Sequence, residues 1–370
     1  MTDPTQDLLP EGLEDRLPQS AAAAARIQRA MLDTLHAYGY DRVRPPLIEF
    51  EQSMARRMEG VRTRGCFRFV DPKSLRTLAL RADMTVQVGR IAATGLADAP
   101  RPLRLCYAGQ VARIAGDMLD PRREYQQIGA ELIGSDTVAA ASEMVELAIA
   151  ALEAAGAQGI SVDFTLPDLV DTLADGPFPL APQQRVAVRR ELDAKDAGAL
   201  VEAGGEAFLP LIHAAGEFEE AAGKLSSIDG AGVLNTRISA LRQIAERVDS
   251  RARLTLDPSE RHGFEYQSWF GFTLYADGVR GALGRGGTYC IGGSDEAATG
   301  FSLYPDGLVE AVKAGEDMGR RLFLPVDHDP AAPARMRAEG WRTVAALSAA
   351  DDPAALGCTH TLENDGPRPL

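Results

Sequence analysis

The sequence has few cysteines, few histidines and no long apolar run. Its four cysteines (Cys66, Cys106, Cys290 and Cys358) are far apart and form no CxxC pair. This spacing argues against a disulfide framework or a zinc cluster, and we predict buried free thiols. The five histidines include no pair at i, i+3 or i, i+4 spacing, which argues against a helical metal site.

Segments that would direct the chain to a membrane are also missing. No stretch approaches the ~18 to 20 consecutive apolar residues that a membrane helix needs. Residues 1–15 are acidic and polar and lack the basic and then apolar regions of a signal peptide. We therefore predict a cytoplasmic protein with no membrane partner.

Basic residues are in deficit. Lys and Arg total 39 against 53 Asp and Glu, a net charge of −14. An acidic surface repels phosphate backbones, so we expect no nucleic-acid partner. The rest of the composition, 370 residues with 45% apolar and 25% charged, is ordinary for a globular protein of two or three structural units.

Apolar periodicity predicts an α+β fold with an antiparallel sheet flanked by helices. Helical spacing covers residues 19–38, 136–155 and 234–248, and strand patterns cover 103–111, 125–133, 160–166, 263–276 and 284–293. Residues 167–252 read as a helical insertion in a domain spanning 1–320. Residues 321–370 read as a short strand–helix–strand–strand segment.

The strand predicted over residues 125–133 carries a polar row. Gln127, Gly129 and Glu131 are two residues apart and share one face, whereas the opposite face is apolar. Glycine in the middle would leave room for a small ligand, with Glu131 pairing with an ammonium group and Gln127 offering a donor and an acceptor. A solvent-exposed sheet face fits the same pattern, so both interpretations stay open.

Other polar residues could complete an amino-acid pocket. Asp83 and Thr85 show the same two-residue spacing after the apolar residues 78–80 and supply an acid and a hydroxyl. Arg113 follows the strand predicted over 103–111 and could hold a carboxylate. Each of these residues also fits an ordinary surface position.

The order of these segments resembles the catalytic domain of histidyl-tRNA synthetase, a class II aminoacyl-tRNA synthetase. The segments that carry the resemblance are, in chain order, LPEG at 9–12 with Asp15, 39–49 (motif 1), LRADMT at 80–85, 103–134 (motif 2, with QQIGAE at 126–131), GFEY at 263–266, GGTY at 286–289 and GFS at 300–302 (the start of motif 3). Motif 1 implies a homodimer interface.

The sequence departs from the synthetase pattern at positions where a synthetase carries catalytic groups. In motif 2 the acid that follows Arg113 by two residues is replaced by Ala115, and the arginine that ends motif 3 is replaced by Gly307. The catalytic arginine before GFEY aligns with His262, beside Arg261. About 60 residues follow motif 3, too few for the usual anticodon-binding domain. The resemblance therefore implies a synthetase fold that has lost the groups stabilising adenylation.

A synthetase-like chain that lacks these catalytic groups and the usual anticodon-binding domain resembles the family of ATP phosphoribosyltransferase regulatory subunits. The resemblance implies a non-catalytic subunit without a cofactor. It would form a homodimer within a hetero-oligomer, with a short-form catalytic subunit that makes phosphoribosyl-ATP and pyrophosphate from ATP and phosphoribosyl pyrophosphate. It also implies a role in the first step of L-histidine biosynthesis and in histidine feedback. The alternatives are a class II-like enzyme activating an amino acid for an acceptor other than full-length tRNA, and an active histidyl-tRNA synthetase.

The same resemblance implies a histidine-like pocket. Its residues would be Asp83, Thr85, Arg113, Gln127, Glu131 and Tyr266. The ammonium group would lie near Asp83, Thr85 and Glu131, and the carboxylate near Arg113. Tyr266 would face the imidazole.

Overall fold

The computed structural model describes residues 8–55, 65–116, 120–261, 267–292, 295–312, 320–363 and 366–370. Contacts divide the chain into two compact units, Met1–Ala311 and Val312–Leu370. Within the described residues, no helix has the length and apolarity needed to cross a membrane.

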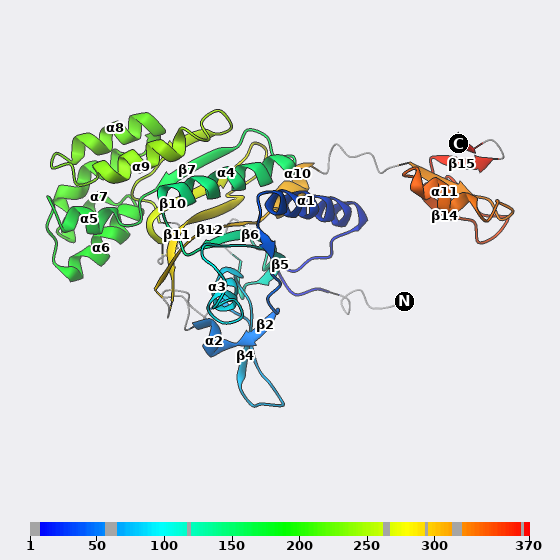
Figure 1. Ribbon diagram of the computed structural model, residues 1–370, viewed down its shortest axis with the longest axis horizontal. Helices are drawn as coiled ribbons and strands as arrows, with labels where there is room; N and C mark the ends of the chain where they lie inside the picture. Colours follow the sequence, from blue (N-terminus) through cyan, green and yellow to red (C-terminus); the bar gives the residue numbers. More distant parts are fainter. Residues whose placement is uncertain are drawn as a thin grey trace. The chain divides into compact units, whose positions relative to one another are not determined.

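The first unit contains most of the secondary structure (Figure 1). Its elements in chain order are α1 (Pro18–Ala37), β1 (Asp41–Arg42), β2 (Ile48–Phe50), α2 (Glu51–Ala55), β3 (Arg68–Val70), β4 (Thr77–Leu80), α3 (Thr85–Ala93), β5 (Leu103–Ala112), β6 (Glu124–Ile133), α4 (Val138–Ala154), β7 (Ser161–Thr165), α5 (Leu169–Ala174), α6 (Pro182–Asp193), α7 (Ala197–Glu202), the 3₁₀ helix η2 (Glu206–His213), β8 (Gly216–Glu217), α8 (Phe218–Ile228), α9 (Asn235–Ala245), β9 (Arg253–Leu256), β10 (Gln267–Tyr275), β11 (Gly284–Ile291), β12 (Glu296–Leu303) and α10 (Asp306–Val312).

A nine-stranded sheet of described residues forms the centre of this unit. Its strand order is β1-β5-β6-β12-β11-β10-β7-β9-β8. The pairings across its middle, from β5 to β7, are antiparallel, while β1 pairs with β5 and β7 with β9 in parallel. The predicted α+β class is confirmed. The two parallel pairings were not predicted, because they join strands that are distant in sequence.

Helices cover both faces of the central sheet. On one face α1 and α4 pack against each other and on β5, β6, β11 and β12. Helix α1 buries Ala23, Ile27, Met31 and Leu35 at helical spacing, and Gly39 follows it with φ +83°, so the helix predicted over 19–38 is confirmed. On the other face α3 packs into a cluster with residues of β5, β6 and β11.

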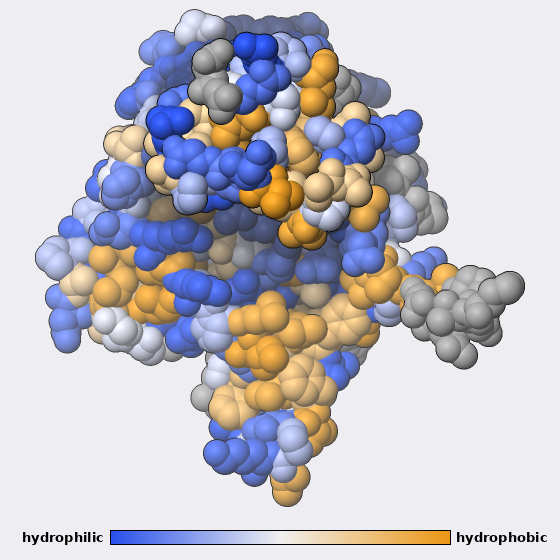
Figure 2. Space-filling view, turned by 90° about the vertical axis from the view of Figure 1, so that its right-hand side faces the viewer, coloured by the Kyte–Doolittle hydropathy of each residue, from blue (hydrophilic) through white to orange (hydrophobic). Residues whose placement is uncertain are grey.

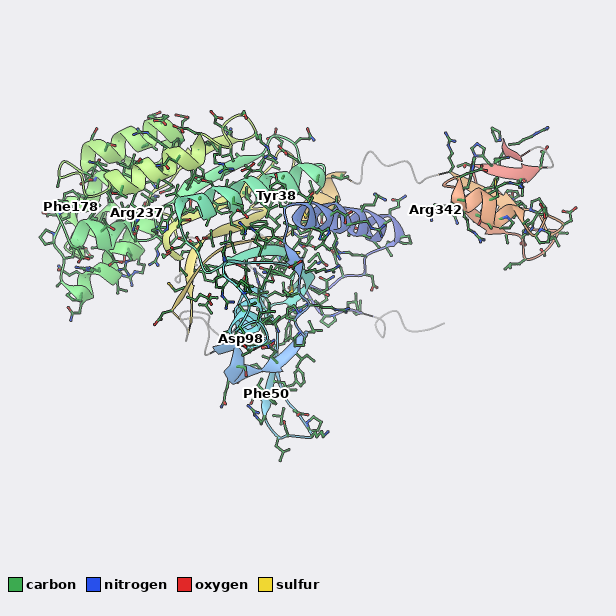
Figure 3. The ribbon with its side chains drawn as sticks, viewed as in Figure 1. Tyr38, Phe50, Asp98, Phe178, Arg237 and Arg342 are labelled. Atoms are coloured by element: carbon green, nitrogen blue, oxygen red, sulfur yellow. The ribbon has the colours of Figure 1, made fainter. Side chains whose placement is uncertain are left out.

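The predicted insertion region, between β7 and β9, is mainly helical. Phe178 packs edge-on against Phe208 with ring centroids 5.3 Å apart, and Arg237 lies on α9 (Figure 3). Arg237 donates to Asp168 Oδ2 at 2.7 and 3.1 Å, and its guanidinium carbon lies 5.4 Å from the Trp269 ring centroid. Arg237 thus links α9 to Trp269 of β10 and to Asp168, the residue before α5.

The second unit is a small α/β element. It contains β13 (Arg321–Leu324), α11 (Ala332–Ala338), β14 (Arg342–Ala345), β15 (His360–Glu363) and β16 (Gly366–Pro369). Its sheet has the order β14-β13-β15-β16, with β13 parallel to both of its neighbours. The predicted elements occur in order, and β16 is an additional strand.

The cysteine prediction is correct for three of four residues. All four are free thiols, and Cys66, Cys106 and Cys358 are buried, but Cys290 is exposed. Cys290 lies between Tyr289 and Ile291, whose side chains are both buried. Because alternate residues of a strand point to opposite faces, Cys290 points away from the core that these two enter.

Candidate ligand-binding site

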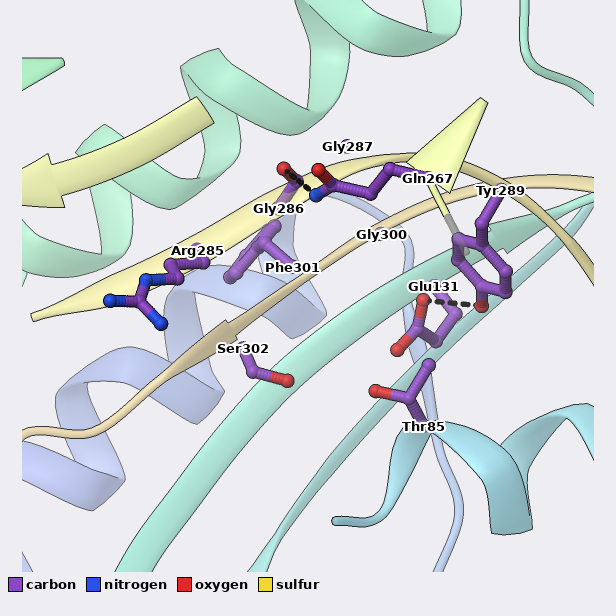
Figure 4. A pocket seen from close by; sticks show the side chains of 10 residues that line it. All are labelled: Thr85, Glu131, Gln267, Arg285, Gly286, Gly287, Tyr289, Gly300, Phe301 and Ser302. Atoms are coloured by element: carbon purple, nitrogen blue, oxygen red, sulfur yellow. Dashed lines mark hydrogen bonds between the residues drawn. The ribbon is translucent and has the colours of Figure 1, made fainter. Parts of the chain in front are cut away.

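A pocket lies on the face of the central sheet that α3 packs against (Figure 4). The space at the pocket amounts to about 310 Å³, part of which is open solvent. Its lining residues come from the start of α3 and from β6, β10, β11 and β12: Thr85, Glu131, Gln267, Arg285, Gly286, Gly287, Tyr289, Gly300, Phe301 and Ser302.

Glycines from neighbouring strands form the floor of the pocket. Gly287 of β11 pairs with Gly300 of β12, and Gly300 pairs with Glu131 of β6. A Cβ atom on Gly300 would overlap the Glu131 carboxylate, and one on Gly287 would overlap the carbonyl oxygen of Phe270. The missing side chain at Gly300 therefore lets the Glu131 carboxylate lie on the sheet, and the Gln267 amide lies over Gly287.

Glu131 is the buried acid of the pocket. Its side chain accepts hydrogen bonds from the hydroxyls of Tyr107 at 2.9 Å and Tyr289 at 2.8 Å, and the residue is 1% exposed. Burial raises the pKa of Glu131 to about 8; the negative charge of Asp83 adds to the rise, and the tyrosine hydrogen bonds oppose it. The carboxyl is therefore mostly protonated at pH 7, and a cation or N–H donor entering the pocket would favour its charged form.

Gln127 is not a lining residue but connects the segments around the pocket. Its Oε1 accepts the backbone N–H of Met84 at 2.9 Å, and its Nε2 donates to Ser302 Oγ at 2.7 Å. The residue is fully buried. The solvent-exposed interpretation of this strand face is therefore wrong. The amide connects β6 to β12 and to the segment before α3, and Ser302 presents its hydroxyl to the pocket.

The predicted room for a ligand above Gly129 is not there. Tyr107 of β5 pairs with Gly129, and a Cβ atom on Gly129 would overlap the Tyr107 hydroxyl. That hydroxyl also lies 3.1 Å from both Thr85 Oγ1 and Ser302 Oγ. Gly129 thus makes space for a tyrosine of this chain, and the tyrosine orients Glu131.

Asp83 and Thr85 lie at the start of α3, not on a strand. Asp83 Oδ1 accepts the N–H of Thr85, the first residue of α3, at 2.6 Å. Thr85 lines the pocket, and Asp83 does not. Asp83 therefore acts on the pocket through its charge and through the position it gives to Thr85.

Arg113 and Tyr266 are not among the lining residues. Arg113 is exposed just after β5, and its guanidinium carbon lies 5.0 Å from the Tyr125 ring centroid and 5.5 Å from that of Tyr304. Tyr266 and His262 lie outside the described residues. The roles predicted for Arg113 and Tyr266 stay predictions.

The pocket contains residues that the sequence analysis did not propose as ligands. Tyr107 and Tyr289 hold Glu131, and Gln267 donates through Nε2 to the carbonyl of Gly286 at 2.9 Å. Arg285 shares a face of β11 with Tyr289. The alternation of Arg285, Gly287 and Tyr289 is visible in the sequence, but the register that places these residues beside Glu131 is not.

Comparisons with known proteins find two groups that the chain is similar to, histidyl-tRNA synthetases and ATP phosphoribosyltransferase regulatory subunits. The family model described as histidyl-tRNA synthetase matches residues 12–308. The ATP phosphoribosyltransferase regulatory subunit of Rhodospirillum centenum is 41% identical over 367 residues, covering 96% of this chain and 95% of that protein. The protein of the same name from Paramagnetospirillum magneticum is 40% identical over 369 residues, covering 97% of each.

The chain belongs to the ATP phosphoribosyltransferase regulatory subunit family. The predicted resemblance is thereby confirmed. The fold agrees with solved structures as well. A protein from Bacillus halodurans described as an ATP phosphoribosyltransferase regulatory subunit/histidyl-tRNA synthetase has a TM-score of 0.82 at 24% identity, covering 96% of this chain and 97% of that one. Histidyl-tRNA synthetase from a Nostoc species has a TM-score of 0.77 at 15% identity, covering 96% and 91%.

In this member of the regulatory subunit family, a side chain at Gly307, the position that ends motif 3, would lie close against Val279. A Cβ atom on Gly307 would lie 2.8 Å from Val279 Cγ1. The preceding Asp306 is buried, forms an ion pair with Arg16 and accepts the N–H of Gln126 at 3.1 Å. An arginine at position 307 would therefore require Val279 to move.

Proposed function

We propose that the chain is the regulatory subunit of an ATP phosphoribosyltransferase and catalyses no reaction itself. The observation that carries the proposal is about 40% identity to regulatory subunits over nearly their whole length. The catalytic partner would be a short-form subunit that forms phosphoribosyl-ATP in the first step of L-histidine biosynthesis, in the cytoplasm. Ala115 and Gly307, at positions where a synthetase carries charged groups, support the absence of catalysis.

We also propose that the pocket binds L-histidine and mediates feedback inhibition. A buried acid held by two tyrosines and a neighbouring threonine suits an ammonium or ring N–H group. Arg113 lies beyond the lining residues, next to Tyr304, and would reach the ligand's carboxylate by a change of rotamer. Gln127 would act through Ser302.

An amino-acid-activating enzyme is the alternative that such a pocket also fits. Only this alternative predicts ATP–pyrophosphate exchange, because exchange requires formation of an aminoacyl-adenylate. An exchange assay on the purified chain with histidine therefore distinguishes the two functions. We expect no exchange above a control without protein.

Homodimerisation is proposed through the segment that resembles motif 1. This segment leads into β2, which forms a three-stranded antiparallel sheet with β4 and β3. The sheet and its hairpin expose Ile48, Phe69, Val70 and Leu75, and hydrophobic residues gather on this lower projection of the molecule (Figure 2). Contiguous exposed apolar residues are typical of interaction surfaces.

We expect a dimer at micromolar concentration by light scattering, and Val70→Asp to shift it toward the monomer. Val70 is 61% exposed, so the substitution costs the isolated chain little but places a charge in an apolar interface. The matched control is Leu347→Asp in the second unit, at a residue that is 96% exposed. A wild-type monomer, or equal effects of both substitutions, would contradict this interface.

A further inference from the structure

Three glycines form a row across the central sheet, next to Glu131. Gly271 of β10 pairs with Gly287 of β11, Gly287 pairs with Gly300 of β12, and Gly300 pairs with Glu131 of β6. Residues that are paired across neighbouring strands share one face of a sheet. Because none of the three glycines has a side chain, this glycine row can be covered only by side chains from neighbouring positions.

Two side chains of the chain itself cover the glycine row. The Glu131 carboxylate lies over Gly300, where it would overlap a Cβ atom. The Gln267 amide lies over the other two glycines: a Cβ atom on Gly271 would be 2.7 Å from Gln267 Oε1, and one on Gly287 would be 2.8 Å from Gln267 Nε2. Both covering side chains line the pocket, and Figure 4 shows Gly300 between them. Gln267 therefore determines how far the pocket extends over the row.

The local structure holds Gln267 in this position. Strands β10 and β11 pair with a register shift just after Gln267. The hydroxyl of the fully buried Thr288 accepts the backbone N–H groups of Trp269 at 3.3 Å and Phe270 at 3.1 Å within this irregular stretch. Such a bulge can re-aim a side chain toward a site. The amide itself is fixed by Gln267 Nε2, which donates to the carbonyl of Gly286 at 2.9 Å (Figure 4).

We propose that Gln267 is the specificity-determining residue of the pocket and excludes ligands larger than histidine. The proposal rests on the proposed function of the pocket as a histidine site, and it adds the residue that limits the size of the ligand. Because Glu131 and Gln267 line the same pocket, a ligand bound to Glu131 meets the Gln267 side chain as a neighbouring wall. Shortening Gln267 uncovers Gly271 and Gly287 and enlarges the pocket on this side.

The test compares L-histidine with its two ring-N-methylated forms, by calorimetric titration of the full chain. One extra carbon against a pocket wall changes binding by about 10-fold or more. We expect the wild-type chain to bind both methylated forms at least about 10-fold more weakly than histidine. Gln267→Ala should bind one of them within about threefold of histidine. Both isomers are used because their methyl groups point in different directions.

Two variants distinguish size from other effects of the substitution. Gln267→Met keeps the length of the side chain but removes the hydrogen bond to Gly286, and it should exclude both methylated forms as wild type does. Gln243→Ala, at an exposed glutamine of α9, is the matched control and should also keep the exclusion. Histidine itself should bind to every variant within about threefold of wild type.

The outcomes that contradict the proposal also show which part of it fails. A wild-type chain that accepts a methylated form, a Gln267→Ala chain that excludes both, or a Gln267→Met chain that accepts one would each overturn the role of Gln267 and leave the histidine site in place. Loss of histidine binding in Gln267→Ala would overturn that role too, because the amide would then contact the ligand directly. Absence of histidine binding by the wild-type chain refutes the histidine site and the proposal with it.

Discussion

Replacing Glu131 with alanine is expected to raise the inhibition constant of histidine for the assembled transferase by about 30-fold or more. The substitution removes the buried acid that two tyrosines hold at 2.8 and 2.9 Å. Removing one partner of a desolvated charge pair commonly costs ~2 to 5 kcal/mol, mostly because the other charge is left unpaired. At about 1.4 kcal/mol per factor of ten, this is a loss of 30-fold or more. Inhibition is measured on the complex with its catalytic subunit.

Two variants complete this experiment. Arg113→Ala should also raise the inhibition constant, through the ligand's carboxylate, and Glu202→Ala, at an exposed acid of α7, should leave it unchanged. Size-exclusion chromatography checks that each complex still assembles. If neither Glu131→Ala nor Arg113→Ala changes the inhibition constant threefold, the pocket is not the histidine sensor.

The second large effect concerns stability, and Glu131→Gln should reveal it. The pKa of Glu131 is about 8 in the folded chain, against a reference value of 4.5. The folded state therefore holds a proton that the unfolded state releases, and the wild-type chain loses stability as pH rises from about 4.5 to about 8. Glutamine is neutral throughout and avoids this loss. Relative to wild type, the variant should gain up to about 4 kcal/mol at pH 8.

Denaturant unfolding of the ligand-free chain at pH 5 and pH 8 measures this difference. The groups around Glu131 include Tyr107 and Tyr289, which donate to it, Thr85, which lowers its pKa, and Asp83, whose charge disfavours its ionisation. The matched control is Glu202→Gln, which should show no such pH trend. A difference between Glu131→Gln and wild type that is the same at both pH values would mean that the buried carboxyl is ionised throughout this range.

Local periodicity predicted the regular elements of the fold well. The helix over 19–38 and the strand over 125–133 follow from apolar spacing alone, and the structure has both. Helix α3 was missed because it is short and because Asp83 and Thr85 were interpreted by their two-residue spacing. The hydrogen bond from the Thr85 N–H to Asp83 places them instead at a helix start.

The sequence predicts only part of the candidate site, because the pairing register between strands determines which residues lie next to one another. The shared face of Gln127, Gly129 and Glu131 follows from strand geometry, but the pairing of Tyr107 with Gly129 does not. That pairing fills the space expected for a ligand and moves the pocket toward Gly300 and Gly287. Arg285 enters the site for the same reason, through pairings of strands distant in sequence.

Reconstitution with the short-form catalytic subunit from the same organism tests the central claim most directly. Formation of phosphoribosyl-ATP from ATP and phosphoribosyl pyrophosphate is measured for each chain alone and for the mixture. The account predicts that the two chains co-elute, that turnover requires the mixture, and that histidine inhibits it, while this chain alone gives no ATP–pyrophosphate exchange. Failure of the chains to associate, or histidine-dependent exchange by this chain alone, would contradict it.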